Sequence, residues 1–169
     1  MIKTLLLLLL PSLIIGQLNK DKLSALQVHN NARKEVGVAL LVWSEKLEEQ
    51  ALNYAKQIAR TNNYKHSNTR DGENLAMFYE YEESNKIKIY IYSDTPLYDA
   101  SNAWYDEIKD YKYSKIKRYR IGMKIGHYTQ MVWKDTKEVG IASAISKNGK
   151  VYVVARYYPA GNYLGEYPY

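Results

Sequence analysis

The stretch IGHYTQMVWKD, Ile125 to Asp135, places a histidine between a glycine and a tyrosine, directly before an apolar run that ends at Trp133. The spacing of its apolar residues predicts a short helix that opens at His127. The whole chain has only three histidines. A single histidine in this setting is more often a hydrogen-bonded structural residue than a ligand, so the stretch alone leaves the role of His127 open.

The segment after this helix carries the clearest strand signal in the chain. VGIASAIS, from Val139, and VYVVARYYP, from Val151, are rich in β-branched residues and flank a turn at Asn148-Gly149. This pattern predicts a β-hairpin with a type I′ turn. The stretch 86–92 alternates isoleucine with lysine and tyrosine, which predicts an edge strand whose lysines discourage unwanted pairing.

Three longer helices are predicted upstream of the opening stretch. The first begins at Asp21 as N-cap and ends at Gly37. The second is capped by Ser44. Its apolar stripe consists of Leu47, Ala51, Tyr54, Ala55 and Ile58. The third has Thr95 as cap and Pro96 at its first helical position. Helices come first and paired strands last, so we expect an α+β fold with helices packed on an antiparallel sheet.

Length and composition predict one secreted domain behind a leader. The chain has 169 residues, of which 46% are hydrophobic. The opening stretch MIKTLLLLLLPSLIIGQ has a basic residue, an apolar run too short for a membrane span, and Gly16 before the expected cleavage point. We assign 1-16 to a signal peptide and 17-169 to a single domain, and expect an extracellular protein. There is no cysteine, so the core must stabilise the domain without disulfides.

Three further polar residues occur where the sequence around them leaves their role open. His66 follows the second helix in the stretch YKHSN, and Glu73 lies in RDGENLAM, at a glycine turn where we expect a helix to start. Glu107 shares an inward helix face with Trp104, and a buried carboxylate needs a partner. Nothing in the spacing brings these residues to His127, and each taken singly favours a structural role.

Two long motifs change this interpretation. GHYTQMVWKDT (Gly126–Thr136) and YVVARYYPAGNY (Tyr152–Tyr163) resemble the two signatures of the CAP superfamily, which comprises cysteine-rich secretory proteins, antigen 5 and pathogenesis-related proteins and is built on the SCP domain. HNNARKEVG, KHS, GENLA and AWYDEIKDY occur in the order of that family. The resemblance covers Leu23 to about Tyr163. The cysteine-free core is most similar to the Golgi-associated plant pathogenesis-related branch.

The resemblance implies a three-layer α-β-α sandwich with a central antiparallel sheet and a central cleft. Carried over residue by residue, the cleft is lined by His66, Glu73, Glu107 and His127. Neutral imidazoles are good zinc ligands, and carboxylates ligate or orient them, so these four residues imply a site for Zn²⁺ or another divalent cation. His29 matches the His-Asn pair of the family's first helix and is interpreted as structural.

The chain departs from the family pattern in two places. The second signature usually carries a cysteine where this chain has Ala155, and the disulfides of secreted relatives are absent. The segment from about Glu80 to Asp94 is longer than in compact members. The disulfide-pinned extra domains of the family, and their activities, are therefore not carried over.

Three functions remain open on these residues. The first is a secreted binding protein that holds a divalent metal in the cleft and engages a sterol, a fatty acid, or a host or immune protein. The second is a metal-dependent, peptidase-like hydrolase in which Glu73 or Glu107 acts as general base. The third is a buried polar network that only fixes the fold. We expect the binding protein, and no enzyme.

The net charge of +6 favours anionic surfaces without selecting one. The basic-aromatic run YKYSKIKRYR (Tyr111–Arg120) is a candidate contact for an anionic membrane surface. A solvated loop is the more common explanation for such a run. Passage through a secretory route makes nucleic acid a poor partner.

Overall fold

The computed structural model describes residues 9–117 and 125–169, with side chains from residue 20 onward. Residues 1–8 of the predicted signal peptide and Arg118–Arg120 of the basic-aromatic run lie outside the described residues. The elements are α1 (Leu9–Glu35), β1 (Val42–Trp43), α2 (Glu45–Thr61), β2 (Gly72–Phe78), β3 (Glu80–Ser84), β4 (Ile87–Ile91), α3 (Pro96–Tyr105), the 3-10 helix η1 (Asp106–Asp110), α5 (Gly126–Met131), β5 (Glu138–Ile145) and β6 (Val151–Tyr158).

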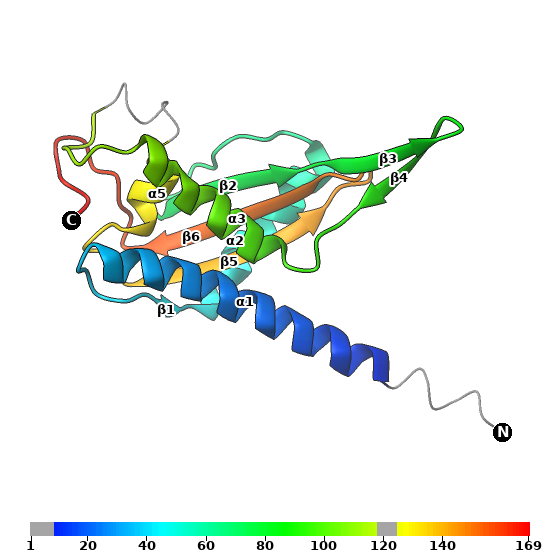
Figure 1. Ribbon diagram of the computed structural model, residues 1–169, viewed down its shortest axis with the longest axis horizontal. Coiled ribbons are helices and arrows are strands. Elements are labelled where there is room, and N and C mark those ends of the chain that lie inside the picture. The colour runs from blue at the N-terminus through cyan, green and yellow to red at the C-terminus, as the bar shows by residue number, and fades with distance from the viewer. Residues whose placement is uncertain (1–8, 118–124) are drawn as a thin grey trace.

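A four-stranded sheet in the order β1-β5-β6-β2 forms the middle layer (Figure 1). The pairs β5–β6 and β6–β2 are antiparallel, and the short β1 adds a parallel pair at the β5 edge. The predicted α+β class and α-β-α sandwich are confirmed. Within the described residues, no helix combines the length and apolar character that a membrane crossing requires.

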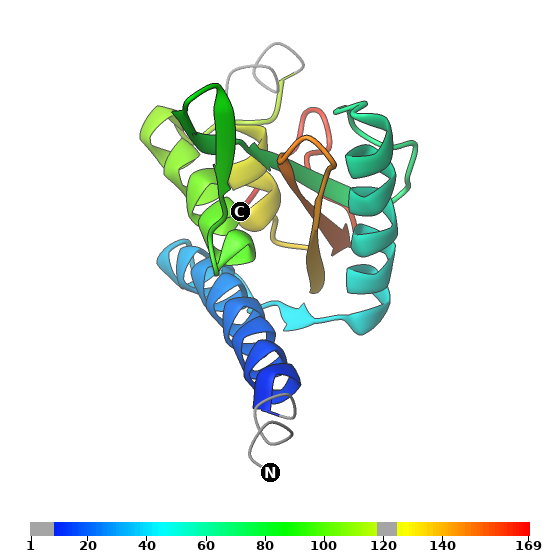
Figure 2. The ribbon, with the colours of Figure 1, turned by 90° about the vertical axis from the view of Figure 1, so that its right-hand side faces the viewer.

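Helices cover both faces of the sheet (Figure 2). On one face lies α2, whose predicted stripe supplies the buried Leu47, Ala51, Ala55 and Ile58. It packs closely because Gly140 of β5 has no side chain: a Cβ there would meet the backbone nitrogen of Glu48 at 2.1 Å. On the other face, α1 packs against α3, and their buried side chains join those of α5 in a second core cluster.

The predicted role of Asp21 is wrong, and its observed role is to join two helices. Asp21 lies inside α1, which begins at Leu9 rather than at Asp21. Its buried carboxylate accepts hydrogen bonds from the backbone nitrogens of Leu97 and Tyr98, at 3.1 and 2.9 Å. Thr95 is the N-cap residue of α3 but makes no side-chain cap bond. Asp21 therefore caps α3 from a neighbouring helix, and the carboxylate satisfies donors that a helix start leaves free.

The type I′ turn predicted at Asn148-Gly149 is wrong, although a turn with type I′ angles is present in another hairpin. In the β5–β6 connection only Gly149 has a positive φ, of 82°, and its nitrogen donates to the Ser146 carbonyl at 3.0 Å, which is a type I turn followed by a left-handed glycine. In the β3–β4 hairpin both turn residues, Asn85 and Lys86, have positive φ, of 52° and 64°. A type I′ turn requires this pair of angles. The strand predicted at 86–92 is thereby confirmed as β4.

A buried arginine fixes α1 against the region that carries His127. The guanidinium of Arg33 donates to the carbonyls of Ala39, Met131, Trp133 and Thr136. Burial lowers the pKa of Arg33 to about 10. Carbonyl oxygens satisfy the charge without a carboxylate, so the C-terminal end of α5 is held in place by a residue of α1.

The described part of the basic-aromatic run packs on the C-terminal segment. The backbone of Ile116, which is buried, pairs with Glu166 and Gly165 at 2.8 and 2.9 Å. The ring of Tyr113 stacks on that of Tyr167 with centroids 5.0 Å apart. These contacts favour the structural explanation of residues 111–117 over a free basic surface.

Candidate functional site

A cleft of about 500 Å³ is lined by all four residues carried over from the family resemblance. His66 comes from the loop after α2, Glu73 from β2, Glu107 from η1 and His127 from α5. The expectation that Glu73 sits near a helix start is wrong. It lies in a strand because β2 pairs with β6, where Glu73 is opposite Arg156, and that pairing is not visible in the local sequence.

One half of the cleft is the pair His127–Glu107, which is ordered mainly by the backbone. The Nδ1 atom of His127 lies 2.7 Å from a carboxylate oxygen of Glu107. The other carboxylate oxygen accepts from the backbone nitrogens of His127 and Tyr128, at 2.8 and 3.1 Å. Glu107 thus caps the start of α5 and orients the imidazole with the same carboxylate, which explains its inward position.

The other half is the pair His66–Glu73, which is ordered mainly by side chains. The Nδ1 atom of His66 lies 2.7 Å from one carboxylate oxygen of Glu73, and the backbone nitrogen of Ser67 donates to that oxygen at 2.9 Å. The second oxygen accepts from the Ser67 hydroxyl and from Arg156, at 2.7 and 2.9 Å. Glu73 and Arg156 form a buried ion pair, with side chains 4% and 6% exposed.

Two opposing effects set the pKa of Glu73. Burial raises it, whereas the hydrogen bonds from His66 and Ser67 and the charge of Arg156 lower it, and the net shift is downward. The carboxylate is therefore held in its ionised form, which only accepts hydrogen bonds.

The proton positions on both cleft histidines follow from these partners. An ionised carboxylate can only accept, so each Nδ1 carries a proton and donates it. In the neutral ring the lone pair is then on Nε2. Among the described residues, neither Nε2 has a hydrogen-bond partner. Within the described residues, the cleft therefore contains two imidazoles, each with an Nε2 lone pair that no protein donor uses.

Sequence reasoning missed the layer beneath these pairs. The side-chain amide of Asn74 donates to the His127 carbonyl at 3.1 Å and to the Tyr157 hydroxyl at 3.0 Å. That hydroxyl lies 2.8 Å from Nε2 of His29, whose Nδ1 is 2.9 Å from the Ala25 carbonyl. Burial lowers the pKa of His29 to about 4, so this histidine is neutral and satisfied, as its structural interpretation expects.

Two tryptophans near the cleft, Trp104 and Trp133, are both buried. The Trp104 ring is 6.1 Å from the His127 ring, and its indole nitrogen donates to the Leu75 carbonyl at 3.2 Å. The Trp133 side chain lies so close to Gly161 in the cleft wall that a Cβ at Gly161 would meet its Cγ at 2.5 Å. Both therefore support the cleft from behind.

The family model described as CAP, the cysteine-rich secretory protein family, matches residues 26–157. The chain belongs to the CAP family. Among its CAP relatives, human Golgi-associated plant pathogenesis-related protein 1 is 35% identical over 145 residues, which span 83% of this chain and 84% of the relative. Pathogenesis-related protein 1A of Nicotiana tabacum is 38% identical over 144 residues, which span 85% and 78%.

The CAP fold is also seen in similar solved structures. A crystal structure of NaASP2 with Zn²⁺ superposes with a TM-score of 0.71 at 26% identity, over 88% of this chain and 84% of that chain. The resemblance drawn from the two long motifs is therefore confirmed, and this CAP domain is of the pathogenesis-related kind.

Proposed function

We propose that this CAP protein is a secreted binding protein whose cleft holds a divalent cation, with Zn²⁺ as the probe, between Nε2 of His66 and Nε2 of His127. The proposal rests on the arrangement of the two cleft histidines. Both imidazoles line the same cleft, and each donates its Nδ1 proton to a carboxylate at 2.7 Å, so each offers an Nε2 that has no partner in the described part of the chain. Histidines that ligate metals characteristically make this second bond to a carboxylate.

The roles of the four residues differ within this proposal. His66 and His127 are the ligands. Glu73 and Glu107 are positioning residues, because their oxygens already accept bonds from imidazole, backbone or Arg156. In the described part of the chain, no group of three or more His, Asp or Glu side chains is arranged to hold a metal ion. A cation held here would thus have two protein ligands, and water or a partner's side chain would complete its coordination.

The same contacts make a hydrolase the weaker hypothesis. When bound, the cation would supply an electrophilic centre at the wall of the cleft. The hydrolase hypothesis requires Glu73 or Glu107 to act as general base, with a free carboxylate oxygen and a pKa near the working pH. Each oxygen of Glu73 and of Glu107 accepts at least one hydrogen bond, and the pKa of Glu73 is lowered. Two tightly bound carboxylates favour a binding role.

Secretion is supported by the leader-like opening stretch and by the name of the matching family, the cysteine-rich secretory proteins. The binding of a sterol or fatty acid stays a prediction. A groove of about 500 Å³ between α1 and α3 has the polar Gln27, Asn31 and Glu35 in its lining, which does not favour an acyl chain. Titration with a labelled sterol and a labelled fatty acid tests this, since saturable uptake is required.

Calorimetry with Zn²⁺ tests the metal proposal. The wild-type chain should bind with a single site, and the double variant His66→Ala/His127→Ala should show no heat of binding at that site while its circular dichroism stays unchanged. Tyr64→Ala is the matched control, because it removes an aromatic side chain close to His66 in sequence that does not line the cleft. Equal zinc affinity of the double variant and the wild type would end the proposal.

A further inference from the structure

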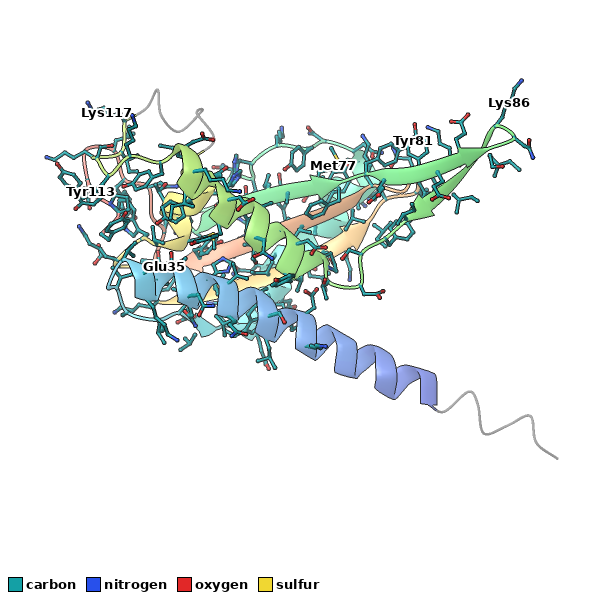
Figure 3. The ribbon with its side chains drawn as sticks, in the orientation of Figure 1. Glu35, Met77, Tyr81, Lys86, Tyr113 and Lys117 are labelled. Atoms are coloured by element: carbon teal, nitrogen blue, oxygen red, sulfur yellow. The ribbon has the colours of Figure 1, made fainter. Side chains whose placement is uncertain are left out.

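The hairpin β3–β4 has an exposed tyrosine among three glutamates, and these residues have no part in the cleft. It projects from the end of the sheet (Figure 1). Figure 3 shows Tyr81 on this hairpin, between Met77 and the turn at Lys86. All five residues of β3 are exposed. The sequence around Tyr81 is FYEYEES, so Tyr81 has glutamate at the preceding position and at both following positions.

We propose that Tyr81 is a site of O-sulfation. The inference rests on the proposed passage through the secretory route, where tyrosine sulfation takes place. The enzyme that performs it binds a highly anionic donor in a basic active site. Electrostatic complementarity therefore favours tyrosines whose neighbours are carboxylates. The side-chain carboxylates of Glu80, Glu82 and Glu83 have no ion-pair or hydrogen-bond partner among the described residues, so their charges are available for this recognition.

The reaction balances without any redox partner. The phenol oxygen of Tyr81 attacks the sulfur of an activated sulfate, which is a mixed anhydride of sulfate and a nucleotide phosphate. A new O–S bond forms and the S–O bond to the phosphate breaks. The phosphate leaves with the bonding electron pair, and the phenol proton passes to a base of the enzyme.

Tyr105 is the other tyrosine that has two carboxylates within two positions of it in the sequence, and the structure distinguishes it from Tyr81. Tyr105 is followed by Asp106 and Glu107, so the sequence alone would also nominate it. Its hydroxyl, however, donates to the Glu35 carboxylate at 2.8 Å at the end of α3. A sulfate there would break this bond and bring two anions together, which is unfavourable.

The ring of Tyr81, in contrast to the Tyr105 hydroxyl, lies beside a cation. The ammonium nitrogen of Lys88 lies 4.2 Å from the centroid of the Tyr81 ring and 5.9 Å from that of Tyr79. Lys150, at the β5–β6 turn, lies 5.9 Å from the same Tyr79 ring. The tyrosine hydroxyls raise the pKa of Lys88, with the hydrogen bond to Tyr79 as the largest cause. A sulfate on Tyr81 would thus be placed beside one or two lysines, which can form charge-assisted hydrogen bonds with it.

The ring is also accessible to an enzyme. Tyr81 is 38% exposed. The hairpin is a two-stranded sheet in which β3 pairs only with β4 among the described strands. The outer edge of β3 is therefore open to an enzyme that binds its substrate as an extended strand.

Expression of the full chain in an animal cell line that contains tyrosine sulfotransferase tests the inference. Protein recovered from the medium is analysed by intact mass, and the modified residue is mapped in the wild-type chain. We expect one sulfate ester on Tyr81, its loss in Tyr81→Phe, and its retention in the control Tyr105→Phe, with unchanged circular dichroism in both variants.

Three results would overturn the inference. An unmodified chain in the medium contradicts sulfation and leaves secretion standing. A phosphate ester, or a sulfate on Tyr105, Tyr79 or any other residue, contradicts the assignment to Tyr81. Retention of the chain inside the cell contradicts both secretion and the sulfation that depends on it. The mapped site in the wild-type chain decides the question even where a variant folds poorly.

Discussion

His127 and His66 each bond a glutamate through Nδ1 at 2.7 Å, yet different kinds of group hold the two glutamates in place. Glu107 is satisfied by backbone nitrogens at the start of α5, and the His127 side chain is 33% exposed. Glu73 depends on a buried side-chain cation, Arg156, and its histidine is 64% exposed. The backbone supports one half of the site, whereas an ion pair supports the other.

This difference predicts which substitution costs more free energy of unfolding. A backbone-built pair keeps much of its geometry when one side chain changes, because the helix that supplies the donors remains. A pair built on a buried charge leaves that charge uncompensated when its partner is removed.

Removal of Glu73 should have the largest effect on stability. Glu73→Ala leaves the guanidinium of Arg156 buried without its carboxylate, and loss of one partner of a buried ion pair destabilises by about 3–5 kcal/mol. Urea denaturation measures the free energy of unfolding. The control is Asp106→Ala, which breaks the exposed pair with Lys109 and should lower stability by less than about 1 kcal/mol. Equal effects of the two substitutions would remove the distinction between the halves.

Acid should weaken the layer beneath the His127 half. The pKa of His29 is lowered from 6.5 to about 4 by burial, so below pH 6.5 the unfolded chain binds a proton that the folded chain rejects. Stability is therefore lost as the pH falls from 6.5 to about 4, by about 3 kcal/mol in total from this group.

Unfolding free energies measured along this pH range test the assignment. His29→Gln should lower the stability at pH 7, because it disrupts the bond to the Tyr157 hydroxyl, but should flatten the dependence between pH 6.5 and 4. The same slope in the variant and in the wild type would show that His29 is not the group that titrates.

Removal of Glu107 should have a smaller effect than removal of Glu73. Glu107→Ala leaves two backbone nitrogens and one imidazole nitrogen without their acceptor, but no buried cation. The expected loss is about 1–3 kcal/mol, again measured by urea denaturation. A loss greater than that of Glu73→Ala would reverse the comparison between the halves.

Replacing either cleft glutamate with the equally large but neutral glutamine should weaken the affinity of the cleft for Zn²⁺. Glu73→Gln and Glu107→Gln keep an oxygen that can accept the Nδ1 proton but lose the negative charge. Changes in such supporting residues typically weaken metal affinity about 10–100-fold. The effect should be larger for Glu73, because His66 is the more exposed ring and Glu73 is its only side-chain partner among the described residues. Calorimetry with Zn²⁺ measures both, and a larger effect at Glu107 would contradict this ranking.

Local patterns predicted the elements whose cause is local. The stripe of α2, the helix at His127, Pro96 at the start of α3 and the strands β4 to β6 follow from periodicity and turn residues. Elements set by distant partners were not predictable in this way. Glu73 is in a strand because β6 pairs with it, and Asp21 caps a helix that begins at Pro96.

The candidate site shows the same division. The four cleft residues were identified only through a family resemblance, because no local rule joins a loop, a strand and two short helices. Arg156, Ser67 and Asn74 were missed. Arg156 did leave a signal, since it is the single charged residue in the otherwise apolar and aromatic strand VYVVARYY. A buried charge on such a strand predicts a buried partner, and Glu73 is that partner.

The proposed site holds one cation between the Nε2 atoms of both cleft histidines. The most direct test is nitrogen NMR of the histidine rings during a titration of the full chain with Zn²⁺. The Nε2 signals of His66 and His127 should shift together and saturate at one equivalent, while both nitrogens of His29 stay unchanged. A shift of only one cleft histidine, saturation at different equivalents, or a shift at Nδ1 in place of Nε2 would contradict it.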